Sequence, residues 1–163
     1  MIRLKIKIKN IVNAIATAFK GGIDQPGYND IPEKITTAFL IKYPHAASAK
    51  WRNVDDTYIA SFGSEDNKYE AFYNTDGRWL KTEIKIPVTR KLPRAINRSL
   101  KIGEFAAWSV KEIKKLEMRD QYLYIIHVDS DNFLDKSQNK FHMAAMLYFN
   151  MDGKLLKIDE YKG

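Results

Sequence analysis

The chain has 163 residues, of which 45% are hydrophobic and 29% are charged, a composition typical of a soluble globular protein with one sizeable core. It has no cysteine, which excludes disulfides, thiolate catalysis and zinc–cysteine sites. The net charge of +7 is uneven, because residues 1–27 hold five basic residues and one acidic residue, whereas Lys and Glu interleave in the rest. Only this N-terminal arm has the dense basic charge that binding to nucleic acid requires, so no nucleic-acid partner is expected for the body of the chain.

The N-terminal arm, residues 1–29, has more than one interpretation. Apolar and basic residues alternate there with the period of an edge strand: Ile2, Arg3, Leu4, Lys5, Ile6, Lys7, Ile8 and Lys9. Residues 11–19 form a short apolar stretch with small residues, so the arm also resembles a degraded secretory signal. A strand or amphipathic helix that stays attached is the alternative. No run of about 20 apolar residues occurs, so membrane contact is expected only through this arm.

The first structural unit is predicted over residues 30–88. A helix is expected at 31–43, with Asp30 as its N-cap, Glu33 completing a capping box and Pro44 ending it. Strand-like runs follow at 46–53, 57–63, 68–74 and 78–86.

The second unit is predicted over residues 89–163. Its helix is expected at 92–102 and is stopped by Gly103. Strand-like runs follow near 105–117, 120–128, 141–149 and 154–161, and residues 129–140 lengthen one hairpin.

The two units share a sequence repeat. The segment Tyr73–Lys81, with Asn-Thr-Asp-Gly at its turn, returns as Phe149–Lys157, with Asn-Met-Asp-Gly. Each copy of a repeat is one structural unit whose apolar face needs the other copy. The predicted fold class is therefore α+β: tandem helix-plus-four-strand repeats that form one antiparallel sheet with both helices on one face.

The Asn-x-Asp-Gly hairpins allow a prediction of register. With a four-residue loop, Glu70 faces Lys81, whereas a tighter closure would place Glu70 opposite Glu83. Opposite charges across a strand pair are favourable, so the first register is preferred. Gly77 and Gly153 are expected at positive φ, and Gly77→Val is expected to destabilise by about 1 kcal/mol or more.

This register predicts which residues face the helices and which do not. The helix-covered face would hold Ala71, Tyr73, Leu80, Ile84, Ala145, Leu147, Phe149, Leu156 and Ile158. The uncovered face would hold the candidate partner-binding residues Phe72, Trp79, Met146, Tyr148 and Leu155. Large apolar residues left exposed on one face are typical of an interaction site. A second copy of the chain, or the N-terminal arm, would be the other way to cover them.

No catalytic or metal-binding motif is found. His45, His127 and His142 have no carboxylate placed beside them to complete a metal site, and the acidic run Asp129, Asp131 and Asp135 lacks the glycine and glutamate of a calcium loop. No nucleophile is paired with a base. We therefore expect no enzyme activity, no cofactor and no metal.

The arrangement resembles the PepSY-like proteins of the beta-lactamase-inhibitor-like fold, small exported proteins of Bacteroidetes, over about residues 30–161. The matching segments are Ile31-Pro32, Tyr43-Pro44-His45-Ala46, Ala49-Lys50-Trp51, Tyr58-Ile59-Ala60-Ser61-Phe62 and Asp76-Gly77-Arg78-Trp79. The second copy keeps Leu92-Pro93 and Asn150-x-Asp152-Gly153 but has Leu155 in place of the tryptophan. The resemblance implies a tandem helix-plus-four-strand fold, a periplasmic or exported location and no catalytic residues.

Two functions from different classes follow. The first is a non-enzymatic exported binding module that uses the uncovered sheet face to hold an unidentified protein partner. Inhibition of that partner is one form of this function, because some relatives of this fold inhibit enzymes through a concave sheet face. The second is an accessory protein of membrane surfaces or nucleic acids that acts through the basic arm, and salt-dependent binding that is lost with the arm would distinguish it.

Overall fold

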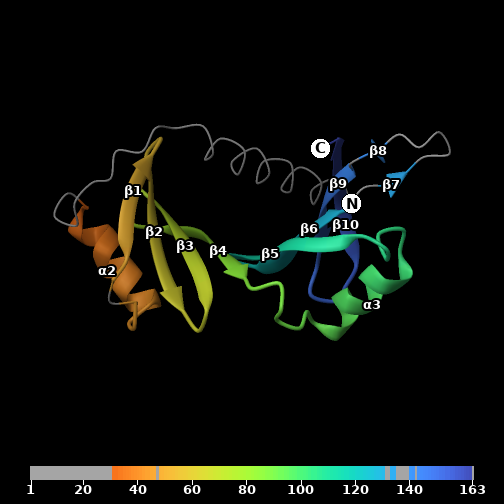
Figure 1. Ribbon diagram of the computed structural model, residues 1–163. Helices are drawn as coiled ribbons and strands as arrows, with labels where there is room; N and C mark the ends of the chain where they lie inside the picture. The colour runs from red at the N-terminus through yellow and green to blue at the C-terminus, as the bar shows by residue number, and fades with distance from the viewer. Residues whose placement is uncertain (1–30, 47, 131–132, 135–139, 142, 163) are drawn as a thin grey trace.

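The computed structural model describes residues 31–46, 48–130, 133–134, 140–141 and 143–162 (Figure 1). The first half comprises α2 (Glu33–Lys42), β1 (Lys50–Val54), β2 (Thr57–Ser64), β3 (Asn67–Asn74) and β4 (Trp79–Ile86). The second half comprises α3 (Arg94–Ile102), β5 (Ser109–Met118), β6 (Gln121–Asp129), β9 (Met143–Phe149) and β10 (Leu155–Lys162). The N-terminal arm lies outside the described residues, so neither interpretation of it is tested.

One antiparallel sheet of eight strands joins the two halves, in the order β1-β2-β3-β4-β5-β6-β9-β10. This confirms the predicted α+β class with a single antiparallel sheet and two helices. The two short strands β7 (Phe133–Leu134) and β8 (Lys140–Phe141) form a separate pair within the lengthened hairpin. In Figure 1 the sheet runs the length of the molecule, with α2 near one end and α3 near the other. In the part of the chain that the structure describes, no helix is long and apolar enough to cross a membrane.

Both helices begin immediately after a proline. Pro32 and Pro93 occupy the N-cap positions with φ of −55° and −48°, and neither helix has a side-chain capping hydrogen bond. The predicted capping box of Asp30 and Glu33 is therefore wrong, because the helix begins at Glu33 itself. Proline has φ already set for helix entry and lacks only an N–H that the first turn would leave unpaired.

Each helix packs its apolar side on the sheet. The core beneath α2 contains Ile31, Ile35, Phe39, Trp51, Ala60, Ala71 and Tyr73. The core beneath α3 contains Ile96, Leu100, Phe105, Ile113, Tyr124, Ile126, Val128, Ala145, Leu147 and Phe149. Strand pairing places both cores on one face, because residues that pair directly, or that lie two apart on a strand, share a face. Ala71 pairs with Thr82, and Ile86, four residues along the same strand, pairs with Ile113.

The two Asn-x-Asp-Gly turns have the same geometry. Asn74 Oδ1 accepts hydrogen bonds from the backbone N–H groups of Asp76 (3.1 Å) and Arg78 (2.9 Å). In the second turn Asn150 Oδ1 accepts from Asp152 (3.1 Å) and Lys154 (2.9 Å). Gly77 and Gly153 have φ of 80° and 77°, which confirms the predicted left-handed position.

The predicted register of the hairpins is wrong. In the first hairpin Phe72 pairs with Lys81 and Glu70 with Glu83, because Leu80 forms a bulge between Trp79 and Lys81. The second hairpin has the same bulge at Leu156, with Phe149 paired to Leu155 and Tyr148 to Lys157. A bulge inserts one residue into one strand and shifts every later pair.

Glu70 and Glu83 each form an ion pair with a basic side chain of their own, so the charges did not decide the register. Arg52 Nη2 lies 3.0 Å from Glu70 Oε1, and Lys81 Nζ lies 2.6 Å from Glu83 Oε1. The two carboxylates can therefore face each other without either lacking a positive partner.

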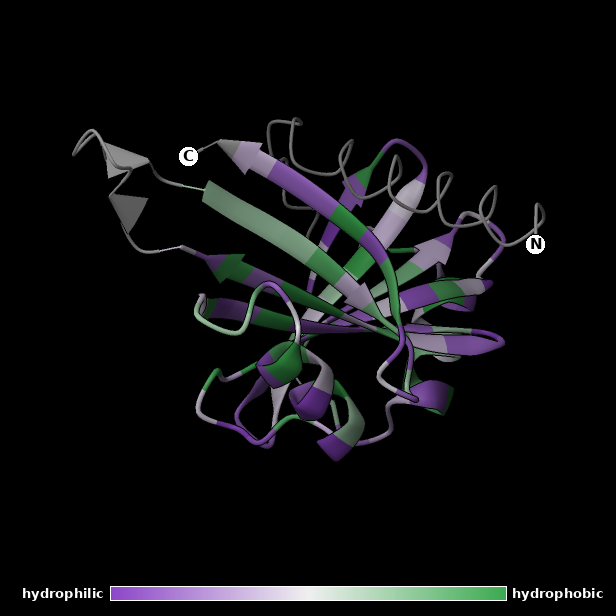
Figure 2. Cartoon of the chain, turned by 90° about the vertical axis from the view of Figure 1, so that its right-hand side faces the viewer, coloured by the Kyte–Doolittle hydropathy of each residue, from purple (hydrophilic) through white to green (hydrophobic). Residues whose placement is uncertain are grey.

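The bulge redistributes the residues assigned to the two faces. Ala71 and Leu147 are buried under the helices as predicted. Trp79 and Leu155, which were expected on the uncovered face, pack instead against the cores beneath α2 and α3. Leu80 was expected to be buried but is 42% exposed, and Leu156 packs on the opposite side of the sheet. The alternation of hydrophilic and hydrophobic residues along the strands can be followed in Figure 2.

Candidate functional site

The face of the sheet opposite α2 and α3, here called the open face, is the first candidate site. Three of the five predicted binding residues belong to it: Phe72, Met146 and Tyr148. Trp79 and Leu155 lie on the helix-covered face. The expected grouping of all five on one face is therefore wrong, while their role in binding stays a prediction.

An apolar group, the open-face cluster, occupies the second half of this face. Its buried members are Leu116, Leu123, Ile125 and Tyr148, and Met118, Met146 and Leu156 pack against them partly buried. Because these residues come from β5, β6, β9 and β10, the cluster spans four neighbouring strands. Neither described helix covers it, since both pack on the other face.

Each half also has a matching set of three side chains on the open face, an aromatic residue, a lysine and an acidic residue, here called the paired sets. In the first set Lys81 Nζ lies 4.1 Å from the ring centroid of Phe72 and 2.6 Å from Glu83 Oε1. In the second set Lys157 Nζ lies 5.1 Å from the ring centroid of Tyr148 and 2.5 Å from Asp159 Oδ2. In both sets the lysine is the direct cross-strand partner of the aromatic residue.

The two aromatic rings are buried rather than exposed. Phe72 is 4% exposed and Tyr148 is 7% exposed, so the expectation of appreciable exposure is wrong. The lysine heads over the rings contribute to this burial through cation–π contact. Burial, together with the charge and hydrogen-bond acceptance of Asp159, raises the pKa of Tyr148 to about 12. The hydroxyl of Tyr148 is therefore a hydrogen-bond donor at neutral pH.

Polar residues from β6 and β10 border the open-face cluster. The Tyr161 hydroxyl and His127 Nε2 share a hydrogen bond of 2.7 Å, and their rings stack with centroids 5.9 Å apart. Among the described residues no three His, Asp or Glu side chains are grouped as metal ligands would be. His142, Asp131 and Asp135 lie outside the described residues, so a site that includes them is not tested.

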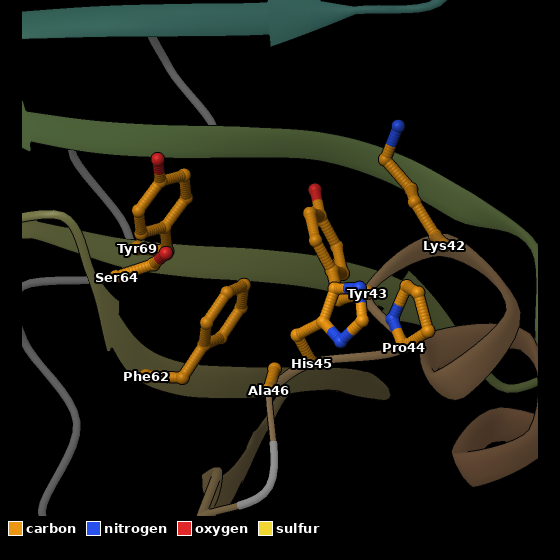
Figure 3. A pocket seen from close by; sticks show the side chains of 8 residues that line it. All are labelled: Lys42, Tyr43, Pro44, His45, Ala46, Phe62, Ser64 and Tyr69. Atoms are coloured by element: carbon orange, nitrogen blue, oxygen red, sulfur yellow. The ribbon is translucent and has the colours of Figure 1, made fainter.

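A pocket of about 280 Å³ lies on the first half, at the end of α2 (Figure 3). Its lining consists of Lys42, Tyr43, Pro44, His45, Ala46, Phe62, Ser64 and Tyr69. Three aromatic rings dominate it: Tyr43 lies 4.8 Å from Phe62, and Phe62 stacks on Tyr69 at 5.0 Å, measured between ring centroids. Lys42, a basic residue of the lining, already has two partners: its Nζ lies 3.1 Å from Glu117 Oε1 and 3.9 Å from the Trp79 ring centroid.

A buried hydroxyl connects this pocket to the sheet. Thr82 is fully buried, and its Oγ1 accepts a hydrogen bond from Trp79 Nε1 (2.9 Å) and shares one of 2.5 Å with the Tyr43 hydroxyl. Burial raises the pKa of Tyr43 to about 12, in spite of the lowering effect of its bond to Thr82. The network fixes the ring of Tyr43 in the pocket wall, which is a positioning role rather than catalytic chemistry.

Replacing Thr82 by valine tests this network. Valine has nearly the same shape, but Trp79 Nε1 and the Tyr43 hydroxyl lose their shared partner, so T82V should lower the free energy of unfolding by about 1–3 kcal/mol. Urea denaturation measures the change. The control is Thr37→Val on the exposed side of α2, expected within about 0.5 kcal/mol of wild type. Equal effects of the two substitutions would contradict the network.

Sequence reasoning missed the lysines and acids of the paired sets. A signal was present, because both Asp-Gly turns are followed by lysine, one intervening residue and an acid: Lys81-Thr82-Glu83 and Lys157-Ile158-Asp159. The spacing of two places each pair on one face of its strand. The wrong register hid the fact that each lysine faces an aromatic residue.

Comparison with known proteins identifies similarity of fold. No protein-family model matches the chain, and no curated protein sequence matches it significantly. A DUF2874 family protein from Bacteroides ovatus ATCC 8483 is 23% identical with a TM-score of 0.69, over 79% of this chain and 86% of that one. A candidate periplasmic protein from Bacteroides eggerthii DSM 20697 is 20% identical with a TM-score of 0.69, over 82% and 90%.

A BLIP-like protein from Bacteroides fragilis NCTC 9343 is also similar, at 22% identity and a TM-score of 0.69, over 84% of this chain and 91% of that one. The expected beta-lactamase-inhibitor-like fold is thereby confirmed. All three identities are below 25%, so the likeness is one of fold.

Proposed function

We propose that this protein is a non-enzymatic exported binding module that holds a protein partner on its open face, with inhibition of that partner as one form of the activity. The observation that carries the proposal is the pair of matching sets, Phe72–Lys81–Glu83 and Tyr148–Lys157–Asp159, beside an apolar cluster that neither described helix covers. Large apolar residues with a charged border are typical of interaction surfaces.

The proposed binding surface differs from the one that the sequence indicated. Phe72, Met146 and Tyr148 remain in it, Leu156 joins them, and Trp79 and Leu155 are left out because they stabilise the helix-covered cores. The aromatic rings form its buried floor, and the partly buried Met146 and Leu156 are the groups that a partner would touch.

Two further inferences complete the proposal. The matching turns, bulges and paired sets favour a tandem repeat of one helix-plus-four-strand unit. The description of one structural neighbour as a candidate periplasmic protein, and of another as BLIP-like, supports an exported binding protein in the sense that the resemblance implies.

A charged substitution on the open face tests the function. Leu156→Arg places a long cation on the open-face cluster, and we expect it to abolish retention of a partner from periplasmic extract of the source organism. The matched control is Ile102→Arg on α3, whose side chain is 77% exposed on the helix side. Proteins retained by wild type and control are compared with those retained by L156R in quantitative mass spectrometry, after circular dichroism shows that both variants are folded. Indistinguishable retention by all three proteins would refute the proposal.

A further inference from the structure

A row of three lysines crosses the centre of the open face. Lys68 in β3 pairs directly with Lys85 in β4, and Lys85 pairs directly with Lys114 in β5. Lys68 and Lys85 are exposed, and Lys114 is half-buried. These strands are the third, fourth and fifth of the eight, so the lysine row lies in the interior of the sheet.

This arrangement works against stability. Like charges directly opposite each other in an antiparallel pair are destabilising, and here two such pairs follow one another. Lysine is often placed on edge strands to prevent edge-to-edge association, but that reason does not apply to interior strands. A feature that lowers the stability of the protein and has no role in its folding is a candidate for binding a partner.

The carboxylates beside the row are shared by its lysines or engaged by other basic side chains. Glu112 Oε1 lies 3.2 Å from Lys85 Nζ and 3.5 Å from Lys114 Nζ, so a single carboxylate serves two lysines. Burial alone would raise the pKa of Glu112, but the charges and hydrogen bonds of Lys114 and Lys85 lower it below its usual value. The nearby Glu70 and Glu83 are engaged by Arg52 and Lys81. Among the described residues no carboxylate lies within ion-pair distance of Lys68.

The row continues into the apolar half of the open face. Lys114 pairs with Ile125, and Ile125 pairs with Tyr148, both members of the open-face cluster. One line across the sheet therefore runs from three basic residues to two apolar residues, each 7% exposed, and then to Lys157, which pairs with Tyr148. Neighbouring strands are about 4.8 Å apart. Residues at i, i+3 and i+7 on one side of a helix are spaced by about 5–6 Å, which matches this step.

We propose that the open face holds an acidic amphipathic helix of a protein partner, laid across the strands with its carboxylates over Lys68, Lys85 and Lys114. Its apolar residues lie against Met146 and Leu156, the partly buried residues that pack on the cluster of Ile125 and Tyr148. This assignment rests on the proposed function, because it names the chemistry of the partner on the same face. Charge complementarity gives the helix its direction as well as its position. The acidic end lies over β3 to β5, and the apolar end lies over β9 and β10.

Binding of a designed probe tests the assignment. The probe is a fluorescein-labelled alanine-rich helical peptide with Glu at i, i+3 and i+7, followed by Leu at i+11 and i+14; a second peptide has Gln in place of Glu. Fluorescence anisotropy should show the Glu peptide binding about tenfold or more tightly than the Gln peptide, with an affinity that falls as salt is added. Equal affinities for the two peptides, or no binding of either, would overturn the assignment.

Paired lysine variants locate the site. K68Q/K85Q should weaken binding of the Glu peptide by about fivefold to tenfold, since each exposed charge pair contributes modestly. Its melting temperature should not fall, because two like-charge pairs are relieved. The control is K91Q/K101Q, which removes the same charge from exposed positions outside the open face and should leave the affinity unchanged. An equal loss in both variants, or no loss in K68Q/K85Q, would overturn the lysine row as the site.

Two further measurements separate this proposal from others. Duplex DNA and phosphatidylglycerol vesicles are tested as probes of other classes, and tighter binding of either through Lys68 and Lys85 would overturn the assignment to a protein helix. If L156R abolishes partner retention while K68Q/K85Q retains it fully, the acidic helix is refuted and the proposed function stands. If neither variant affects retention, both fail.

Discussion

Replacing Gly153 by alanine is expected to lower the free energy of unfolding by at least about 3 kcal/mol. Gly153 has φ of +77°, and a Cβ there would lie 2.5 Å from the carbonyl carbon and 2.6 Å from the carbonyl oxygen of Ala95 in α3. A left-handed conformation costs a side-chain-bearing residue about 1–3 kcal/mol, and displacing a helix backbone adds a similar amount. The turn is also tied to the helix by Ser99 Oγ, which donates to the Gly153 carbonyl at 2.6 Å.

Two other glycines calibrate this result in urea denaturation. Gly77→Ala should cost less, because its Cβ would lie 2.9 Å from the Lys34 carbonyl oxygen, which is a milder overlap. Gly63→Ala should be nearly neutral, since its nearest neighbour, the Asn67 carbonyl oxygen, would be 3.8 Å away and its φ is not positive. If G153A proved no more damaging than G63A, the docking of hairpin on helix would be wrong.

Replacing Phe39 by alanine should cost about 3–5 kcal/mol, the range found when a fully buried phenylalanine is truncated. Phe39 is 1% exposed at the centre of an aromatic group. Its ring centroid lies 5.2 Å from that of Trp51, 5.3 Å from Phe62 and 5.5 Å from Tyr43. The substitution removes the edge-to-face contacts with Trp51 and Phe62 as well as buried area.

The neighbouring residue supplies the control for Phe39. Leu40 is on the same helix but 45% exposed, so L40A should change the free energy of unfolding by less than about 1 kcal/mol. Both are measured by urea denaturation with tryptophan fluorescence as the signal. A cost for F39A within error of that for L40A would show that α2 does not depend on this packing.

Local sequence patterns predicted the helices, the strands and the glycine turns, but not the register of the hairpins. The two helices and the eight main strands could be predicted because turn residues and apolar periodicity are local signals. Gly77 and Gly153 could be assigned positive φ because only glycine takes that conformation without steric cost. The resemblance to the beta-lactamase-inhibitor-like fold rests on the same local motifs, and the comparison of structures agrees with it.

The register could not be predicted, because it depends on a bulge that no residue type announces. Leu80 and Leu156 look like ordinary strand residues, and each is instead the extra residue that shifts the pairing. Glu70 and Glu83 can also face each other across the strands, because Arg52 and Lys81 are their ion-pair partners. An error of one residue exchanged the faces of Trp79 and Leu155, and the predicted site changed with it.

The order of the strands in the sheet has a mechanical consequence. Because that order is the order of the chain, each main-sheet strand is held only by the segments that precede and follow it among those strands. A pull on the two ends of the described chain would therefore reach α2 and then β1 at one end and β10 at the other, and the loss of β1 or β10 breaks a single ladder. The strands then separate from the two edges of the sheet inward. The central ladder of β4 with β5, which joins the two halves, separates last.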